Sequence, residues 1–172
     1  MHEIGRLWET AQISVAQEHL STQITQAAIA TLSLHLQGRA PVGAGRVAVA
    51  ASSPGEMHGL GTQMVADFLE TQGWEVLNLG ADSPAAEVAA LTHRRAAAVV
   101  ALSTALPGHL LSVTRTCQLL RQLPQPPFIV AGGRAYGGDA QRAFALGADA
   151  FADDPERLLD LLGQRFAGAA PR

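Results

Sequence analysis

Two residues with useful chemistry, a glutamate and a histidine, stand two positions apart in the stretch Glu56-Met57-His58-Gly59-Leu60-Gly61. An apolar run at 47–51 precedes this stretch, and a segment at 62–72 with apolar residues at helical spacing follows it. The stretch is therefore expected to form the corner between a buried strand and a helix. Open α/β sheets bind ligands outside the carboxyl ends of their strands, so a carboxylate and an imidazole at this corner are suited to ligand or metal chemistry.

Two further groups of residues are expected at the same edge of the sheet. The loop after the third expected strand begins with two hydroxyl residues, Ser103 and Thr104. The loop after the fourth begins with Gly132 and Gly133, where a backbone without side chains lets a bulky group approach closely. These loops would surround whatever the first corner binds.

A dinucleotide is poorly matched to the first corner. Its fingerprint needs Gly-x-Gly-x-x-Gly in the first turn and an acidic residue at the end of the second strand. The corner offers Gly55, Gly59 and Gly61 at a different spacing, and the His58 imidazole would obstruct a pyrophosphate.

A tetrahedral zinc site is poorly matched as well. His35, His93 and His109 fall on separate expected helices, and Cys117 is the single cysteine of the chain. A lone loop histidine can instead be one axial ligand of a metal that a macrocycle already holds. A carboxylate such as that of Glu56 would then accept the other ring N–H, which fixes the tautomer and raises the donor strength of the coordinating nitrogen.

These residues together resemble the cobalamin-binding domains of the methionine synthase and mutase type. The shared pattern is Glu56-x-His58-x-x-Gly61, then Ser103 after the third expected strand and Gly132-Gly133 after the fourth. The chain departs from the family at two points. Glutamate replaces the usual aspartate at position 56, and Ser-Thr-Ala replaces the usual Ser-x-Leu at 103–105.

The resemblance implies a cobalamin cofactor whose cobalt is bound from below by His58. Glu56 would be the partner of this histidine, Ser103 would contact the displaced nucleotide tail, and the glycine pair would form a wall of the slot that takes the tail. The cofactor-binding residues expected in this part of the chain are Glu56, Met57, His58, Gly59, Leu60, Gly61, Ser103, Thr104, Gly132 and Gly133.

The elements that would position these residues alternate between strand and helix. The strands are expected at 46–52, 74–79, 97–102, 128–131 and 150–151, and the helices at 60–72, 85–94, 108–123, 139–146 and 155–166. This alternation predicts the α/β class, with a Rossmann-like, doubly wound sheet of five parallel strands.

The first part of the chain follows a different pattern and predicts a partial helical-bundle cap. Residues 1–37 read as one or two helices, with a break near Ser14, which is suited to cap the second helix. The glycine-rich segment 38–45 is expected to be a linker, 46–172 the cobalamin-binding domain, and its end at 167–172 frayed. One or two helices cannot bury an apolar stripe alone, so this part should pack on another surface.

The spacing Trp8-x9-Glu18-His19 in these helices resembles the cap of CarH-type cobalamin photoreceptors. The resemblance implies that Trp8, Val15, Glu18 and His19 enclose the upper ligand, and it makes His19 a candidate ligand on the upper face of cobalt. Well-studied members have a histidine after the tryptophan, where this chain has Glu9, so a bis-histidine adduct is not expected unless His19 takes that role.

The same resemblance implies parts that would precede this sequence. The full cap is a four-helix bundle, which a winged-helix DNA-binding domain precedes, and this chain starts at what would be the third helix. We expect the missing helices or an output domain to come from a longer chain or from a partner chain. The alternative is that copies of this chain form a homo-oligomer.

The resemblance favours a cobalamin-binding sensory module without catalysis of its own, which responds to light through adenosylcobalamin and changes its conformation or oligomeric state. Methylcobalamin and hydroxocobalamin are alternative forms of the cofactor. The alternative function is a corrinoid carrier domain of a cobalamin-dependent methyltransferase or mutase, and a module for protein contacts without cofactor is a third. A bilin, which the similar photocobilin group binds beside cobalamin, has no motif of its own among these residues.

Composition argues against some classes of binding partner. The chain has 172 residues, a net charge of −3 and no basic run, so we expect no nucleic-acid binding by the chain itself. No apolar stretch reaches the ~20 residues of a membrane span, and no signal peptide is evident. We therefore expect a cytoplasmic location and no membrane partner.

Overall fold

The computed structural model describes residues 2–36 and 45–167 and divides the chain into two compact units, residues 1–37 and 38–172. The predicted linker at 38–45 lies outside the described residues except for Gly45. The predicted frayed end at 167–172 lies outside them except for Ala167.

The second unit contains a sheet of five parallel strands in the order β2-β1-β3-β4-β5. This confirms the predicted α/β fold. The strands are β1 Val47–Ser52, β2 Glu75–Gly80, β3 Val99–Ser103, β4 Phe128–Gly132 and β5 Ala150–Ala152, and the helices of this unit are α3 Leu60–Thr71, α4 Ala85–Arg94, α5 Leu110–Arg121, α6 Ala140–Ala145 and α7 Pro155–Phe166.

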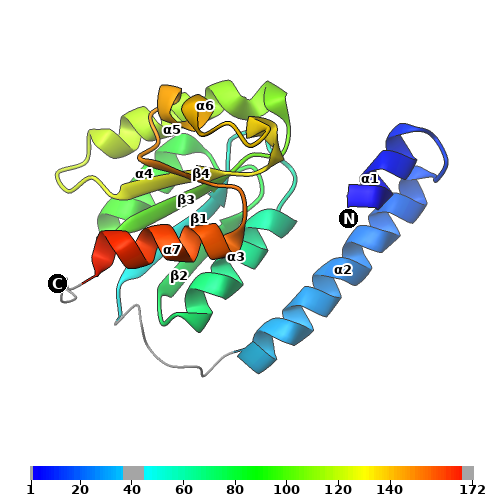
Figure 1. Cartoon of the computed structure of the whole chain (residues 1–172), viewed down its shortest axis with the longest axis horizontal. Coiled ribbons are helices and arrows are strands. Elements are labelled where there is room, and N and C mark those ends of the chain that lie inside the picture. Colours follow the sequence, from blue (N-terminus) through cyan, green and yellow to red (C-terminus); the bar gives the residue numbers. More distant parts are fainter. Residues whose placement is uncertain (1, 37–44, 168–172) are drawn as a thin grey trace. The chain divides into compact units, whose positions relative to one another are not determined.

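Helices cover both faces of the sheet (Figure 1). Alternate residues of the strands point to opposite faces, so Val49 and Val100 pack with α4, α5 and α6, whereas Ala48 and Val99 pack with α3 and α7. The two apolar layers make the sheet a rigid platform for the loops at its carboxyl edge.

Helix α5 differs from its predicted span of 108–123 at both ends. It begins after a short 3₁₀ turn, Pro107–His109, and its last residues form i→i+3 bonds from Gln122 to Leu119 and from Leu123 to Leu120. Pro124 follows, and the residue before a proline disfavours helical geometry. The early turn leaves His109 at the start of the helix, where it faces the loops.

The first unit consists of two helices, α1 His2–Glu9 and α2 Val15–Leu36, and α1 folds back along the first part of α2 (Figure 1). Ser14 caps α2 as predicted. Its Oγ accepts from the Gln17 amide at 3.3 Å, and the Gln17 Oε1 accepts from the Ser14 amide at 2.8 Å, which makes a capping box. Among the described residues, no helix is long and apolar enough to cross a membrane.

Candidate functional site

The register of the sheet brings the functional loops to one edge. Ser52 at the end of β1 pairs with Ser103 at the end of β3, which pairs in turn with Gly132 at the end of β4. The loops that follow these three strands therefore start side by side. Strands β1 and β3 are also where the strand order reverses, and open α/β sheets bind their ligands at such a switch point.

The carboxylate of Glu56 is fully buried and is the centre of the hydrogen bonds at this edge. Its Oε1 accepts from His58 Nδ1 and from the His58 amide, the latter at 3.1 Å. Its Oε2 accepts from the amides of Ala105 at 2.8 Å and Leu106 at 2.9 Å, and from His109 Nδ1 at 3.1 Å. One side chain thus ties the loop after β1 to the loop after β3.

These bonds keep the carboxylate ionised. Burial raises the pKa of Glu56, but the bonds from the His58 side chain, the Leu106 amide and the His109 side chain outweigh burial and lower the pKa to about 2. An ionised carboxylate only accepts hydrogen bonds, so His58 Nδ1 must carry its proton. In the neutral imidazole the lone pair then lies on Nε2, and the side chain is 53% exposed.

Other contacts fix the backbone of this loop. The Gly55 amide donates to Asp82 Oδ1 at 2.8 Å, and the Asp82 amide donates to the Glu56 carbonyl at 2.8 Å. The Ser52 hydroxyl donates to the His58 carbonyl at 3.1 Å. The orientation of the imidazole is therefore set by the protein before any ligand binds.

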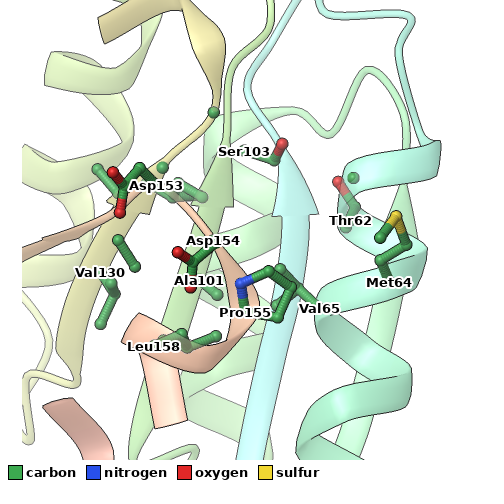
Figure 2. A pocket seen from close by; sticks show the side chains of 16 residues that line it. Thr62, Met64, Val65, Ala101, Ser103, Val130, Asp153, Asp154, Pro155 and Leu158 are labelled. Carbon is green, nitrogen blue, oxygen red and sulfur yellow. The ribbon is translucent and has the colours of Figure 1, made fainter. Parts of the chain in front are cut away.

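A mainly apolar cavity of about 220 Å³ opens beside this loop, between α3, the strand ends and the start of α7 (Figure 2). Four of the residues predicted from the sequence line it: Gly61, Ser103, Gly132 and Gly133. Its other walls include Thr62, Met64 and Val65 of α3, Val130 of β4, and Asp154, Pro155 and Leu158 at the start of α7.

The glycine pair is required by the protein's own backbone as well. A Cβ at Gly132 would lie 2.3 Å from the Ala152 carbonyl oxygen, and one at Gly133 would lie 2.3 Å from the Thr104 carbonyl oxygen. Gly133 also has a φ of +104°, which side chains rarely adopt. The sequence suggests glycines here because a bulky ligand would approach closely. The structure adds a second reason, which is that the carbonyl groups of Ala152 and Thr104 already lie close to these two positions.

Six of the ten predicted residues in this unit do not line the cavity, namely Glu56, Met57, His58, Gly59, Leu60 and Thr104. Thr104 is fully buried, and its hydroxyl donates to Ser53 Oγ at 3.1 Å, so it supports the loop from behind. Met57 is strongly exposed beside His58, and Leu60 begins α3. Gly59, also among the predicted residues, precedes α3 as its N-cap residue.

Two residues that hold Glu56 and its loop in place, His109 and Asp82, are not among the site residues predicted from the sequence. The sequence pattern places His109 on an expected helix, where it is a candidate only for a zinc ligand. The pairing of β1 with β3 would have indicated His109, because the carboxyl ends of neighbouring parallel strands meet at one edge of the sheet and the loops that follow them lie side by side. Asp82 follows β2, which also pairs with β1.

The remaining predicted residues belong to the first unit. Trp8 lies in the last turn of α1 and is 48% exposed, and Val15 is the first residue of α2. Glu18 and His19 lie in the first turns of α2, with His19 Nε2 3.7 Å from Glu18 Oε2. The other oxygen of Glu18 accepts from the Thr22 hydroxyl at 2.8 Å.

Comparison with known protein families decides which ligand this edge binds. A family model described as a B12 binding domain matches residues 46–161, and a second model with the same description matches residues 1–33. The chain belongs to the B12-binding domain family. Its α/β unit is a cobalamin-binding domain, which confirms the resemblance to the methionine synthase and CarH type.

Curated relatives include two repressors and an enzyme. The chain is 34% identical to the HTH-type transcriptional repressor CarH of Myxococcus xanthus over 134 residues, which are 77% of this chain and 44% of that protein. It is 30% identical to the repressor CarA of the same organism over 156 residues, 89% of this chain and 52% of that protein. It is 30% identical to methionine synthase of Mycobacterium tuberculosis over 104 residues, 60% of this chain and 9% of that protein. The chain thus spans about half the length of the repressors and a small part of the enzyme.

Solved structures share the fold. The monomethylamine corrinoid protein of Methanosarcina barkeri aligns with a TM-score of 0.77 at 20% identity, covering 94% of this chain and 76% of that one. A cobalamin-binding protein from Desulfitobacterium hafniense aligns with a TM-score of 0.66 at 22% identity, covering 97% of this chain and 78% of that one. These matches show a common fold.

The residues at the edge fit a cobalamin. His58 points Nδ1 at Glu56 and leaves Nε2 without a partner among the described residues, and a neutral imidazole binds a metal through such a nitrogen. The ionised Glu56 behind it is the partner that metal-binding histidines commonly have. The adjacent cavity is lined mainly by apolar side chains and glycines, as a slot for a flat organic group requires.

Proposed function

We propose that this chain is a cobalamin-binding sensory module that responds to light, with His58 as the lower axial ligand of cobalt. The observation that carries the lower half of this proposal is the buried Glu56 carboxylate, which fixes the His58 tautomer and leaves Nε2 free. The similarity to CarA extends over 89% of the chain and supports a regulatory role.

The α/β unit supplies the lower half of the site. His58 Nε2 would bind cobalt, and Glu56 would keep its imidazole in place. The displaced nucleotide tail would enter the cavity beside the loop, where the Ser103 hydroxyl and the backbone at Gly132 and Gly133 line the wall.

The first unit supplies the upper half in this proposal. Trp8 and the pair Glu18 and His19 would surround the upper ligand, with Val15 as an apolar neighbour and His19 as a candidate ligand once that face is vacant. Adenosylcobalamin supplies, when bound, a cobalt–carbon bond that light breaks. Trp8 would pack against the flat adenosyl group, and α1 and α2 would be free to change their contacts when that face is empty.

The expected output is a change of oligomeric state or of contacts with an output domain. Illumination would change the contacts of α1 and α2, whereas the hydrogen bonds around Glu56 would keep the loop below cobalt in the same conformation. A corrinoid carrier of a methyltransferase or mutase is the second candidate, which the similarity to methionine synthase favours. It would use His58 and Glu56 in the same way but would leave the upper face open to a partner enzyme.

One experiment separates the two candidates. The chain is reconstituted in the dark with adenosylcobalamin or methylcobalamin, and absorption spectra and size-exclusion profiles are recorded before and after green light. The sensor predicts a spectral change together with a change in size, strongest with adenosylcobalamin. A carrier predicts no change in size with either cofactor, and the absence of both a spectral change and a change in size would exclude the sensor.

A further inference from the structure

A second cavity lies at the opposite edge of the sheet, where the strands begin. It measures about 390 Å³ and is lined by the first residues of β1 and β4, the segment before β3 and the end of α7. The side chains that matter for its chemistry are those of Arg46, Arg95, Gln125, Phe128, Arg165 and Phe166. It is larger than the cavity beside His58 and shares no residue with it.

Two arginines at this cavity stack on the same aromatic ring. The guanidinium carbon of Arg46 lies 5.3 Å from the centroid of the Phe166 ring, and that of Arg165 also lies 5.3 Å from it. Edge-to-face contacts with Trp74 at 5.4 Å and Phe128 at 6.4 Å hold the ring in place. The aromatic cluster therefore places both guanidinium groups at the cavity wall.

The same two arginines have no counter-charge in the described part of the chain. No carboxylate among the described residues lies within 4 Å of either guanidinium, whereas Arg95 pairs with Glu75. The cavity thus carries two uncompensated positive charges in a chain whose net charge is −3. Two positive charges in one concave site concentrate anions there.

Stacking leaves the N–H groups at the edge of a guanidinium free to donate. A planar guanidinium binds phosphate or carboxylate oxygens through two parallel bonds, and such charge-assisted bonds are stronger than neutral ones. We propose that this cavity is a binding site for the phosphate group of a small molecule, with Arg46 and Arg165 as the residues that recognise it. The cavity volume lies in the range of small-ligand sites, and the apolar side chains of Val47 and Phe128 would face the uncharged part of the ligand.

Titration calorimetry of the full chain with inorganic phosphate and inorganic pyrophosphate tests the proposal. We expect one saturable site with a dissociation constant of about 1 mM or lower for pyrophosphate, and weaker binding as salt is added. The double variant Arg46→Gln/Arg165→Gln should weaken binding by at least about tenfold. Arg115→Gln, which removes an exposed arginine of α5 away from this cavity, should change binding less than about twofold.

Equal binding by the double variant and the control would overturn the proposal, as would the absence of saturable binding. A glutamate-rich peptide is a second probe, and a peptide that binds at this site while both phosphates do not would assign it to a protein partner and overturn the small-molecule proposal. The thermal midpoint of each variant shows whether the aromatic cluster is intact. Cobalamin binding by the same variants should be unchanged, so a failure here is distinct from a failure of the sensor proposal.

Discussion

The loop around Glu56 and the helix pair α1–α2 differ in how they are stabilised. The Glu56 carboxylate accepts five hydrogen bonds from the described part of the chain and has no exposed surface. In α1 and α2 several large apolar side chains are instead exposed, among them Trp8, Leu20 and Ile24. The loop is complete without a partner, and the helix pair is not.

We expect the loop around Glu56 to hold the ligand and the helix pair to make the contacts that change. A preorganised loop holds a ligand in one geometry, because its bonds are formed before binding. Exposed apolar side chains on a helix pair lower their free energy when they meet another surface, so this pair is expected to pack against a further surface. The same chain thus combines a fixed half with a half whose contacts remain to be made.

The largest effect on stability is expected from Glu56→Gln. The amide has one acceptor oxygen and turns its NH₂ group toward donors, either His58 Nδ1 or the amides of Ala105 and Leu106. The pKa of about 2 against an ordinary value of 4.5 corresponds to roughly 3 kcal/mol at neutral pH. Chemical denaturation of both proteins at pH 7 measures the difference, and a loss below about 0.5 kcal/mol would contradict this account of the loop.

The pH dependence follows from the same carboxylate. Its pKa is lower in the folded than in the unfolded chain, so the unfolded chain binds more protons in acid. The stabilisation is present above pH 4.5 and is lost as the pH falls toward about 2. Denaturation curves across this window should show a fall in the unfolding free energy that is reduced in Glu56→Gln, and parallel curves for the two proteins would exclude Glu56 as its source.

A smaller effect is expected from His109→Ala. This variant removes one donor to Glu56 and leaves the two backbone amides that bind the same oxygen. We expect a loss of about 1 kcal/mol in unfolding free energy, with cobalamin still bound. His93→Ala on α4 is the matched control, since that side chain is exposed and has no contact with the loop. Equal losses in both variants would mean that His109 does not support Glu56.

The smallest effect on stability is expected from Trp8→Ala. Trp8 is half exposed, so its loss should change the unfolding free energy by less than about 0.5 kcal/mol. Trp74→Ala is the contrasting variant, because Trp74 is buried against Phe166 and its loss should cost about 3 kcal/mol.

If Trp8 encloses the upper ligand, its variant should also lose the preference for adenosylcobalamin over hydroxocobalamin in binding titrations, and an unchanged preference would remove Trp8 from the proposed site.

The sequence was sufficient for the fold because its signals are local. Apolar runs at the strands, Pro155 at a helix start and Gly73 and Gly147 after helix ends all act within a few residues. The helix capping by Ser14 follows from the same kind of pattern. The α5 boundaries differed because a proline and a 3₁₀ turn act at both of its ends.

The site was predicted in part, for a physical reason. Glu56 and His58 are two residues apart, so their pairing is visible in the sequence. His109 and the amides of Ala105 and Leu106 reach the same carboxylate only through the pairing of β1 with β3. The direction of the Thr104 side chain depends on packing behind the loop, which spacing does not encode.

The most direct test of the central claim is the electron paramagnetic resonance spectrum of the cobalt(II) form of cobalamin bound to nitrogen-15-labelled protein. If His58 is the lower ligand, each cobalt line splits into a doublet in the labelled protein and a triplet in unlabelled protein, and His58→Ala loses the splitting that depends on the protein label. Triplets that persist in the labelled protein would show that the nitrogen belongs to the cofactor's own base, and they would contradict the assignment of His58.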